Sequence, residues 1–222
     1  MDLRARTIVH FIRHGDALPD AETTFTGSAG YDDLGLSAKG VDQARALAQR
    51  LAATLDLAAI VSSPTRRAHE TAAAVAEGCG RAISLDERLR EIDLGDESLP
   101  PALAPRERAT AIRARLAGLA ATALREGSWS SVAGSEPADR VATRIGAAVD
   151  DVVRAYPGAH VALVSHAGTI NAYFARLIGI ERTFFFPTGN TSISSVRIEG
   201  GVARVLRLND AAHLERPRNG AR

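Results

Sequence analysis

The first apolar run of the chain ends abruptly in charged residues, and this pattern constrains the fold most strongly. Residues 7–12 are mostly β-branched or aromatic, and Arg13, His14 and Gly15 come directly after them. Six such residues, bounded by charge and then glycine, predict a buried strand. In an open α/β sheet, the residues just beyond the carboxyl end of a strand lie where ligands bind. The sequence therefore predicts Arg13 and His14 at the mouth of a sheet.

The same pattern occurs twice more along the chain. The apolar run 57–61 leads through serine and proline into a basic helix start with Arg66, and the run 160–164 leads into His166. The carboxyl ends of parallel strands meet at one edge of a sheet, so these side chains are expected close to His14. A lone Arg-His-Gly is more simply a strand end with two solvated polar residues, but three such strand ends favour a shared site.

The residue types at this edge suit a phosphate group. Arginine presents a planar fork of donors to phosphate oxygens, and a neutral histidine ring can act as a nucleophile. Glycine lets the backbone turn sharply and approach an anion. Arg13 and Arg66 would also favour a neutral His14, because they disfavour a third positive charge nearby.

Five motifs together resemble the histidine phosphatase superfamily, also called the phosphoglycerate mutase-like family, over about residues 7–213. They are Arg-His-Gly, Leu-Ser-x-x-Gly-x-x-Gln-Ala, Ser-Ser-Pro-x-x-Arg-Ala, Leu-Arg-Glu and Ser-His-Ala-Gly. The resemblance implies an α/β fold: a three-layer α/β/α sandwich with a mostly parallel central sheet and a helical insertion over the active-site cleft. We expect a single domain over residues 1–215, with the insertion at about 98–135 and a flexible tail at 216–222.

The resemblance also implies catalytic roles. The expected activity is that of a histidine acid phosphatase-type phosphomonoesterase, a hydrolase in which His14 forms a transient phosphohistidine. Arg13 and Arg66 are expected to hold the phosphate, and His166 to donate to its oxygens. Glu91 stands at the place of the family's proton donor.

Further substrate contacts are expected from two places. Backbone N–H groups at the helix start near Gly168 would assist the phosphate. Thr26 and Gly27 lie in the loop at 18–36, which resembles the substrate-side loop of the mutases, although a variable surface loop is an equally good interpretation of each residue.

Two departures from the family pattern affect these assignments. After Gly95 the sequence lacks the family's usual aromatic residue, so Asp93 and Asp96 stay open as alternatives to Glu91. Asp20 lies near the position of the family's phosphate-binding asparagine, and a carboxylate there would repel phosphate, so Asp20 is not assigned as a ligand.

Other polar residues are expected to be structural. Arg67 and His69 are interpreted as surface or rim residues. His10 is expected to be a hydrogen-bonded core residue, and His160 and His213 are expected in structural or surface positions.

Helical periodicity predicts two helices that together cover part of the cleft. The apolar face of the first is made by Ile112, Leu116, Leu119 and Ala123. The second, after residues 134–137, has an apolar face made by Val141, Ile145, Val149 and Val152.

Composition limits the partners. The net charge of +1 gives no reason to expect nucleic acid or a membrane. The single Cys79 excludes an internal disulfide and a cysteine-based metal cluster. No metal-binding motif is present, so we expect no metal and no cofactor, a small phosphorylated metabolite as partner, and by default a cytoplasmic location. A homodimer stays open, because residues 184–186, three phenylalanines, could form an interface, although a core position is the better interpretation.

The compact insertion and the remodelled loop after His14 favour a metal-independent phosphatase of small phosphomonoesters. A phosphoglycerate mutase is the alternative, because the residues around Thr26 resemble the mutase loop. A phosphate-binding or regulatory module with weak turnover is a third hypothesis, but binding alone does not need an acid at Glu91.

Overall fold

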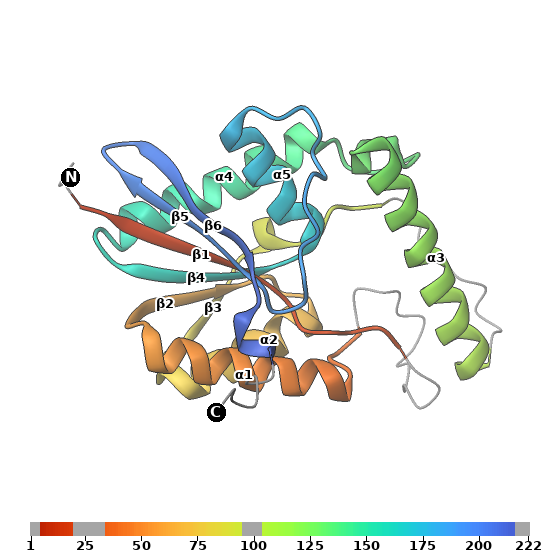
Figure 1. Cartoon of the computed structure of the whole chain (residues 1–222), viewed down its shortest axis with the longest axis horizontal. Coiled ribbons are helices and arrows are strands. Elements are labelled where there is room, and N and C mark those ends of the chain that lie inside the picture. Colours follow the sequence, from red (N-terminus) through yellow and green to blue (C-terminus); the bar gives the residue numbers. More distant parts are fainter. Residues whose placement is uncertain (1–4, 20–33, 95–103, 216–222) are drawn as a thin grey trace, which may run out of the picture.

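A six-stranded sheet in the order β3-β2-β4-β1-β5-β6 forms the centre of the computed structural model (Figure 1), which describes residues 5–19, 34–94 and 104–215. The strands are β1 (Thr7–Arg13), β2 (Leu57–Ser62), β3 (Ile83–Leu85), β4 (His160–Ser165), β5 (Ile193–Glu199) and β6 (Val202–Asp210). Strands β1 to β4 run parallel, and the β5–β6 hairpin adds an antiparallel edge beside β1. The predicted mostly parallel sheet is confirmed.

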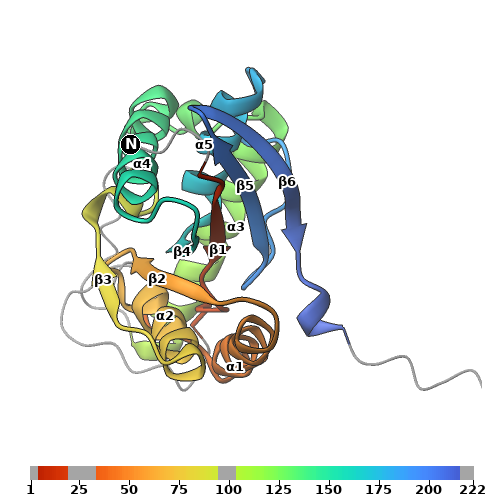
Figure 2. The same ribbon diagram turned by 90° about the vertical axis from the view of Figure 1, so that its left-hand side faces the viewer.

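Helices cover both faces of this sheet, as Figure 2 shows. One face carries α1 (Ala38–Thr54) and α2 (Arg66–Cys79), and the other carries α4 (Ala138–Ala155) and α5 (Ala167–Ile178). Each helix pair has its own apolar core against the sheet. The three-layer sandwich expected from the motifs is therefore confirmed.

The two cores explain the apolar periodicities of the sequence. Leu47 and Leu51 of α1 pack with Val75 of α2 under the sheet. Phe11 and Phe174 meet on the opposite face, with ring centroids 5.2 Å apart. Residues 185 and 186 of the phenylalanine run pack, partly buried, against this second core, which agrees with the core interpretation.

The helix α3 (Pro105–Glu126) stands apart from both layers, beyond the carboxyl ends of the strands (Figure 1). The prediction that both helices cover the cleft is wrong for the second of them. Helix α4 belongs to the sandwich, because Ile145 and Val149 pack into the core with Val9 and Val161. Within the described residues, α3 is the helix of the predicted pair that lies beside the cleft.

Candidate active site

Three parallel strand ends bring their polar residues to one edge of the sheet, as predicted. Arg13 at the end of β1 pairs with Ser165 at the end of β4, so His14 and His166 come next, side by side. Their ring centroids are 5.0 Å apart. The end of β2, beside β4, supplies Ser63. The sequence thus located the correct edge and both histidines.

His14 is buried, with 3% of its surface exposed, and both of its ring nitrogens are hydrogen-bonded. Nδ1 lies 2.7 Å from the carbonyl oxygen of Gly15 and therefore donates to it. Nε2 accepts a hydrogen bond from Nε of Arg67 at 3.3 Å. Burial, followed by the positive charges of Arg67 and Arg13, lowers the pKa of His14 well below its usual value. The ring is thus neutral, with its free electron pair on Nε2.

Arg67 occupies the position that the sequence assigned to Arg66. The guanidinium of Arg67 is completely buried and bonds Nε2 of His14 and Nδ1 of His166, each at 3.3 Å. Arg66 is exposed and forms an ion pair with Glu70 at 2.7 Å. The prediction of Arg66 beside His14 and the surface interpretation of Arg67 are therefore both corrected. Successive helix residues point about 100° apart, so neighbours in the first turn of α2 face different surroundings.

His166 completes the group of Arg13, His14, Arg67 and His166, called here the His–Arg cluster. Its Nε2 lies 3.0 Å from Oγ of Ser63 and 3.3 Å from Oγ1 of Thr65. Since Nδ1 accepts from Arg67, Nε2 carries the proton and donates to these hydroxyls. Burial and then Arg67 lower the pKa of His166 well below its usual value. Both hydroxyl partners were missed in the sequence, although they belong to the serine-rich segment before α2.

Arg13 lies at the rim of the cluster. Its Nη1 donates to the carbonyl oxygen of Thr188 at 2.5 Å. Its Nε is buried and has no hydrogen-bond partner within the described part of the chain. Since a buried guanidinium N–H is costly to leave unpaired, this donor favours an anion at the site.

Glu91 is fixed against the first turn of α5. Oε1 accepts from the backbone N–H and the hydroxyl of Thr169 at 3.0 and 3.3 Å, and Oε2 accepts from the N–H of Gly168 at 3.3 Å. The Gly168 N–H expected to assist phosphate therefore has Glu91 as its partner. A Cβ on Gly168 would come within 2.8 Å of Oε1 of Glu91 and 2.9 Å of Nε1 of Trp129, so a larger residue here would displace the Glu91 carboxylate or the Trp129 ring.

Arg144 holds the backbone that carries Glu91. From α4, its guanidinium donates to the carbonyl oxygens of Arg88, Arg90 and Glu91 at 2.6 to 3.1 Å. It also forms a bidentate pair with the carboxylate of Glu136 at 2.9 and 3.0 Å, largely shielded from solvent. Arg144 was missed in the sequence, because its partners are carbonyl groups more than fifty positions away.

The Leu-Ser-x-x-Gly-x-x-Gln motif supports the loop after β1. Gln43 accepts from the N–H of Asp16 at 2.8 Å, and the hydroxyl of Ser37 donates to the Asp16 carboxylate at 2.6 Å. A Cβ on Gly40 would collide with the Asp16 carbonyl oxygen, so α1 approaches this closely only through glycine. This motif therefore positions His14 indirectly.

The remaining predicted residues divide into two groups. His69 is exposed, while His10 is buried and bonds Ser195 Oγ and His160 Nδ1, each at 2.9 Å, as expected for structural histidines. The expected contacts of Thr26 and Gly27, and the assignments at Asp20 and Asp96, lie outside the described residues.

The family model of the histidine phosphatase superfamily (branch 1) matches residues 9–211, which contain all four cluster residues and the sheet apart from the first two residues of β1. The chain belongs to the histidine phosphatase superfamily.

Individual members of the superfamily are similar along most of the chain. The probable phosphoglycerate mutase GpmB of Enterobacter sp. (strain 638) is 29% identical over 172 residues, which make up 78% of this chain and 75% of the relative. The solved structure of Bacillus stearothermophilus YhfR is 28% identical, with a TM-score of 0.72, over 94% of this chain and 100% of its own. The native structure of mycobacterial glucosyl-3-phosphoglycerate phosphatase Rv2419c is 27% identical, with a TM-score of 0.67, over 92% of this chain and 99% of its own.

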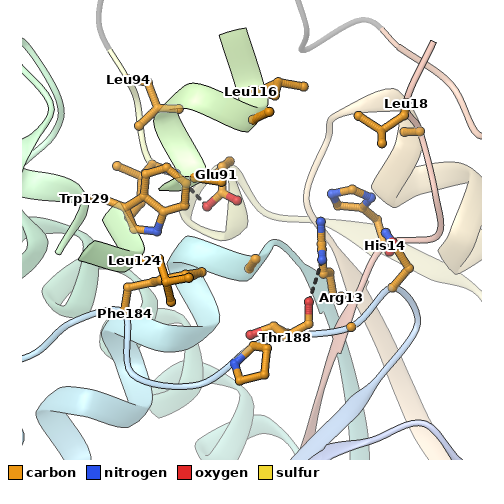
Figure 3. A pocket seen from close by; sticks show the side chains of 18 of the residues that line it. Arg13, His14, Leu18, Glu91, Leu94, Leu116, Leu124, Trp129, Phe184 and Thr188 are labelled. Atoms are coloured by element: carbon orange, nitrogen blue, oxygen red, sulfur yellow. Dashed lines mark hydrogen bonds between the residues drawn. The ribbon is translucent and has the colours of Figure 1, made fainter. Parts of the chain in front are cut away.

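In this member of the superfamily the His–Arg cluster borders a cavity of about 1110 Å³ (Figure 3). Arg13, His14 and Glu91 line this cavity. The other lining residues come mainly from α3 and from the stretches 16–18, 90–94 and 187–190. Its apolar lining residues are Ala17, Leu18, Ile92, Leu94, Leu116, Ala117, Ala120, Ala121, Leu124, Trp129, Ala167, Phe184 and Pro187.

The described ranges also bear on metal binding and on membrane insertion. No three His, Cys, Asp or Glu side chains in residues 5–19, 34–94 and 104–215 come together as a metal ion would require. None of the helices in these ranges combines the length and apolar character needed to cross a membrane.

Proposed function

We propose that the protein is a metal-independent phosphatase that hydrolyses small phosphomonoesters through a phosphohistidine on Nε2 of His14. The observation that carries this proposal is the state of His14. The Gly15 carbonyl holds the proton on Nδ1, and burial with two adjacent arginines keeps the ring neutral, so Nε2 has an electron pair for attack on phosphorus.

Two guanidinium groups supply the positive charge that phosphoryl transfer requires. Arg13 has a buried Nε–H without a partner among the described residues, and Arg67 donates to His14 by a long bond. A phosphate oxygen is a stronger acceptor than a neutral ring nitrogen, so a bound phosphate takes over the donors of Arg67. The Nε2–H of His166 becomes a further, uncharged donor to the phosphate when the ring turns away from Ser63. These groups stabilise the charge on the transferring phosphoryl group.

Glu91 is the proposed acid and base. As Nε2 of His14 bonds to phosphorus, the bond from phosphorus to the ester oxygen breaks, and the protonated Glu91 gives its proton to that oxygen. Water then attacks the phosphohistidine, Glu91 takes up a proton from this water, and the N–P bond breaks. Oε2 is the better position for the transferred proton. Within the described residues it accepts a single hydrogen bond, at 3.3 Å, whereas Oε1 accepts several.

A phosphoglycerate mutase is the second candidate, because curated relatives carry the name of that enzyme. The similarity to the mycobacterial glucosyl-3-phosphoglycerate phosphatase supports the phosphatase to the same degree. Both reactions use the same covalent intermediate and differ in the group that accepts the phosphoryl.

The first test is hydrolysis of p-nitrophenyl phosphate in EDTA, beside a 3-phosphoglycerate mutase assay primed with 2,3-bisphosphoglycerate. We expect hydrolysis that EDTA does not reduce, without mutase turnover, and an acid-labile phosphoprotein in rapid-quench samples. Inhibition by EDTA that added metal reverses would contradict metal independence, and mutase turnover would establish the second candidate.

His14→Ala should abolish both turnover and the phosphoprotein while the protein stays folded. His69→Ala, at an exposed histidine on α2, is the matched control and should retain both. Substantial residual hydrolysis by the His14 variant would remove this residue from the nucleophile role.

A further inference from the structure

We propose that the cavity beside the His–Arg cluster binds an apolar leaving group, so that the preferred substrates are phosphate monoesters of hydrocarbon-rich alcohols. This inference rests on the proposed function, because it takes the phosphoryl group to be held at His14. It adds the chemical class of the alcohol, which the catalytic residues leave open.

One wall of the cavity is an apolar stripe on α3. Leu116, Ala117, Ala120, Ala121 and Leu124 recur at the spacing of one helix face, and all five line the cavity. Leu124 is 62% exposed, and the three alanines are also exposed. These side chains lie beside a second stripe of α3, including Ile112 and Ala123, that is already buried. The lining stripe is therefore apolar surface that a bound molecule can cover.

The wall next to the carboxyl end of α3 is aromatic. Trp129 and Phe184 meet edge to face, with ring centroids 5.2 Å apart, and both line the cavity together with Leu94. Figure 3 shows these side chains on one side of the cavity, and Arg13 and His14 on the other. Cavities of this size and lining bind ligands with a large apolar part.

The charged side chains along the cavity, apart from the cluster and Glu91, do not favour an acidic substrate. Arg90 pairs with Glu87, whereas Arg113 donates to the neutral carbonyl oxygen of Pro19 and keeps its positive charge. Asp16 and Asp93 add negative charge to the lining. The two arginines and the two aspartates of the lining cancel in charge, so a carboxylate on the leaving group would lose water here without meeting a net positive charge.

The geometry of displacement directs the alcohol into this space. In-line attack by Nε2 of His14 places the leaving oxygen on the far side of phosphorus. Glu91, which would protonate that oxygen, lines the same cavity. The rest of the alcohol then extends past Glu91 toward the apolar walls.

The test is a series of unbranched alkyl phosphates from ethyl to octyl, because their leaving groups differ little in acidity. We expect kcat/KM to rise about twofold to fourfold per methylene, as burial of each added group predicts, and to exceed that for 3-phosphoglycerate. Calorimetric titration with the matching alkylphosphonates, which cannot be hydrolysed, should give affinities that rise in parallel.

A matched pair of variants on α3 tests the position of the alkyl chain. Ala120→Phe narrows the cavity and should lower the octyl-to-ethyl ratio of kcat/KM at least tenfold. Ala114→Phe makes the same change at an exposed position outside the lining and should leave the ratio unchanged.

The outcomes separate this inference from the proposed function. Hydrolysis with no dependence on chain length, or with a preference for 3-phosphoglycerate, would overturn the apolar leaving group and leave the phosphatase intact. Phosphonate affinities that rise with chain length, without hydrolysis of any ester, would support the apolar site and overturn the phosphatase.

Discussion

Replacing Arg67 by methionine should cost far more activity than the same change at Arg66. The Arg67 guanidinium is completely buried and contacts both histidines. Removing one preorganised donor from a site that excludes water lowers kcat by about 10²–10³-fold, or about 3–4 kcal/mol. Arg67 carries a full charge, so we expect a loss near the upper end of this range.

Arg66→Met is the control, because it makes the same substitution at the adjacent residue of α2. The Arg66–Glu70 pair is formed by side chains that are 54% and 34% exposed, and a pair of this kind on a helix contributes only about 0.3–0.5 kcal/mol. We expect less than about a threefold change in kcat/KM for this variant. Circular dichroism and thermal melting would establish that both variants are folded before their rates are compared.

The pH profile separates a role at the reacting group from a general loss of structure. After burial, the charge of Arg67 is the largest influence that lowers the pKa of His14. Without that charge the pKa rises, so the acid limb of kcat/KM should move to higher pH in Arg67→Met and stay in place in Arg66→Met. A larger loss in Arg66→Met, or an acid limb that does not move in Arg67→Met, would refute the assignment.

The contacts of Glu91, Arg144 and His10 lead to three further predictions. Glu91→Gln should slow alkyl phosphates by about 10²–10⁴-fold and p-nitrophenyl phosphate much less, since nitrophenolate leaves without a proton; equal losses would indicate positioning alone. Arg144→Met should also slow alkyl phosphates more than p-nitrophenyl phosphate, but by a smaller factor than Glu91→Gln. Arg140→Met, at an exposed position, is the control. A simple folding defect would slow both substrates equally. Burial lowers the pKa of His10 from 6.5 to about 4. As pH falls from 6.5 to about 4, the unfolded chain therefore binds a proton at His10 before the folded protein does. This acidification should lower the free energy of unfolding by about 3 kcal/mol. Denaturant unfolding of wild type and His10→Asn at about pH 7 and about pH 4 measures this loss, which the variant should not share.

The sequence was sufficient for the sheet and its reactive edge. A buried parallel strand is a short apolar run, and the residues directly after it must lie at the sheet edge, so Arg13, His14 and His166 could be placed without coordinates. The error at Arg66 concerned which residue of the first turn of α2 faces the site. Residues 67 and 71 share the buried face of α2, whereas Arg66 and Glu70 form an exposed pair. The Ser-Ser-Pro-x-x-Arg motif already contained the signal, because its arginine is Arg67.

Other features depend on contacts that periodicity cannot encode. An apolar helix face shows that a helix is buried, but the same face suits a sheet or another helix. Helix α4 was therefore expected over the cleft although Ile145 and Val149 face the sheet. Arg144 is a single charge on this helix, and its three carbonyl partners are set by the path of a loop distant in sequence.

The reaction and the substrate are therefore encoded by different kinds of residue. Charge stabilisation and nucleophilic attack require fixed atoms, so the residues near His14 carry recognisable motifs. The apolar wall of α3 needs only volume and a lack of charge, which Ala117 and Ala120 provide without any motif. Two proteins with the same cluster can thus differ in the alcohol that they release when this helix changes. For this chain, the alkyl phosphate series measures the volume and polarity of the cavity, whereas the Arg67 variant measures the reaction.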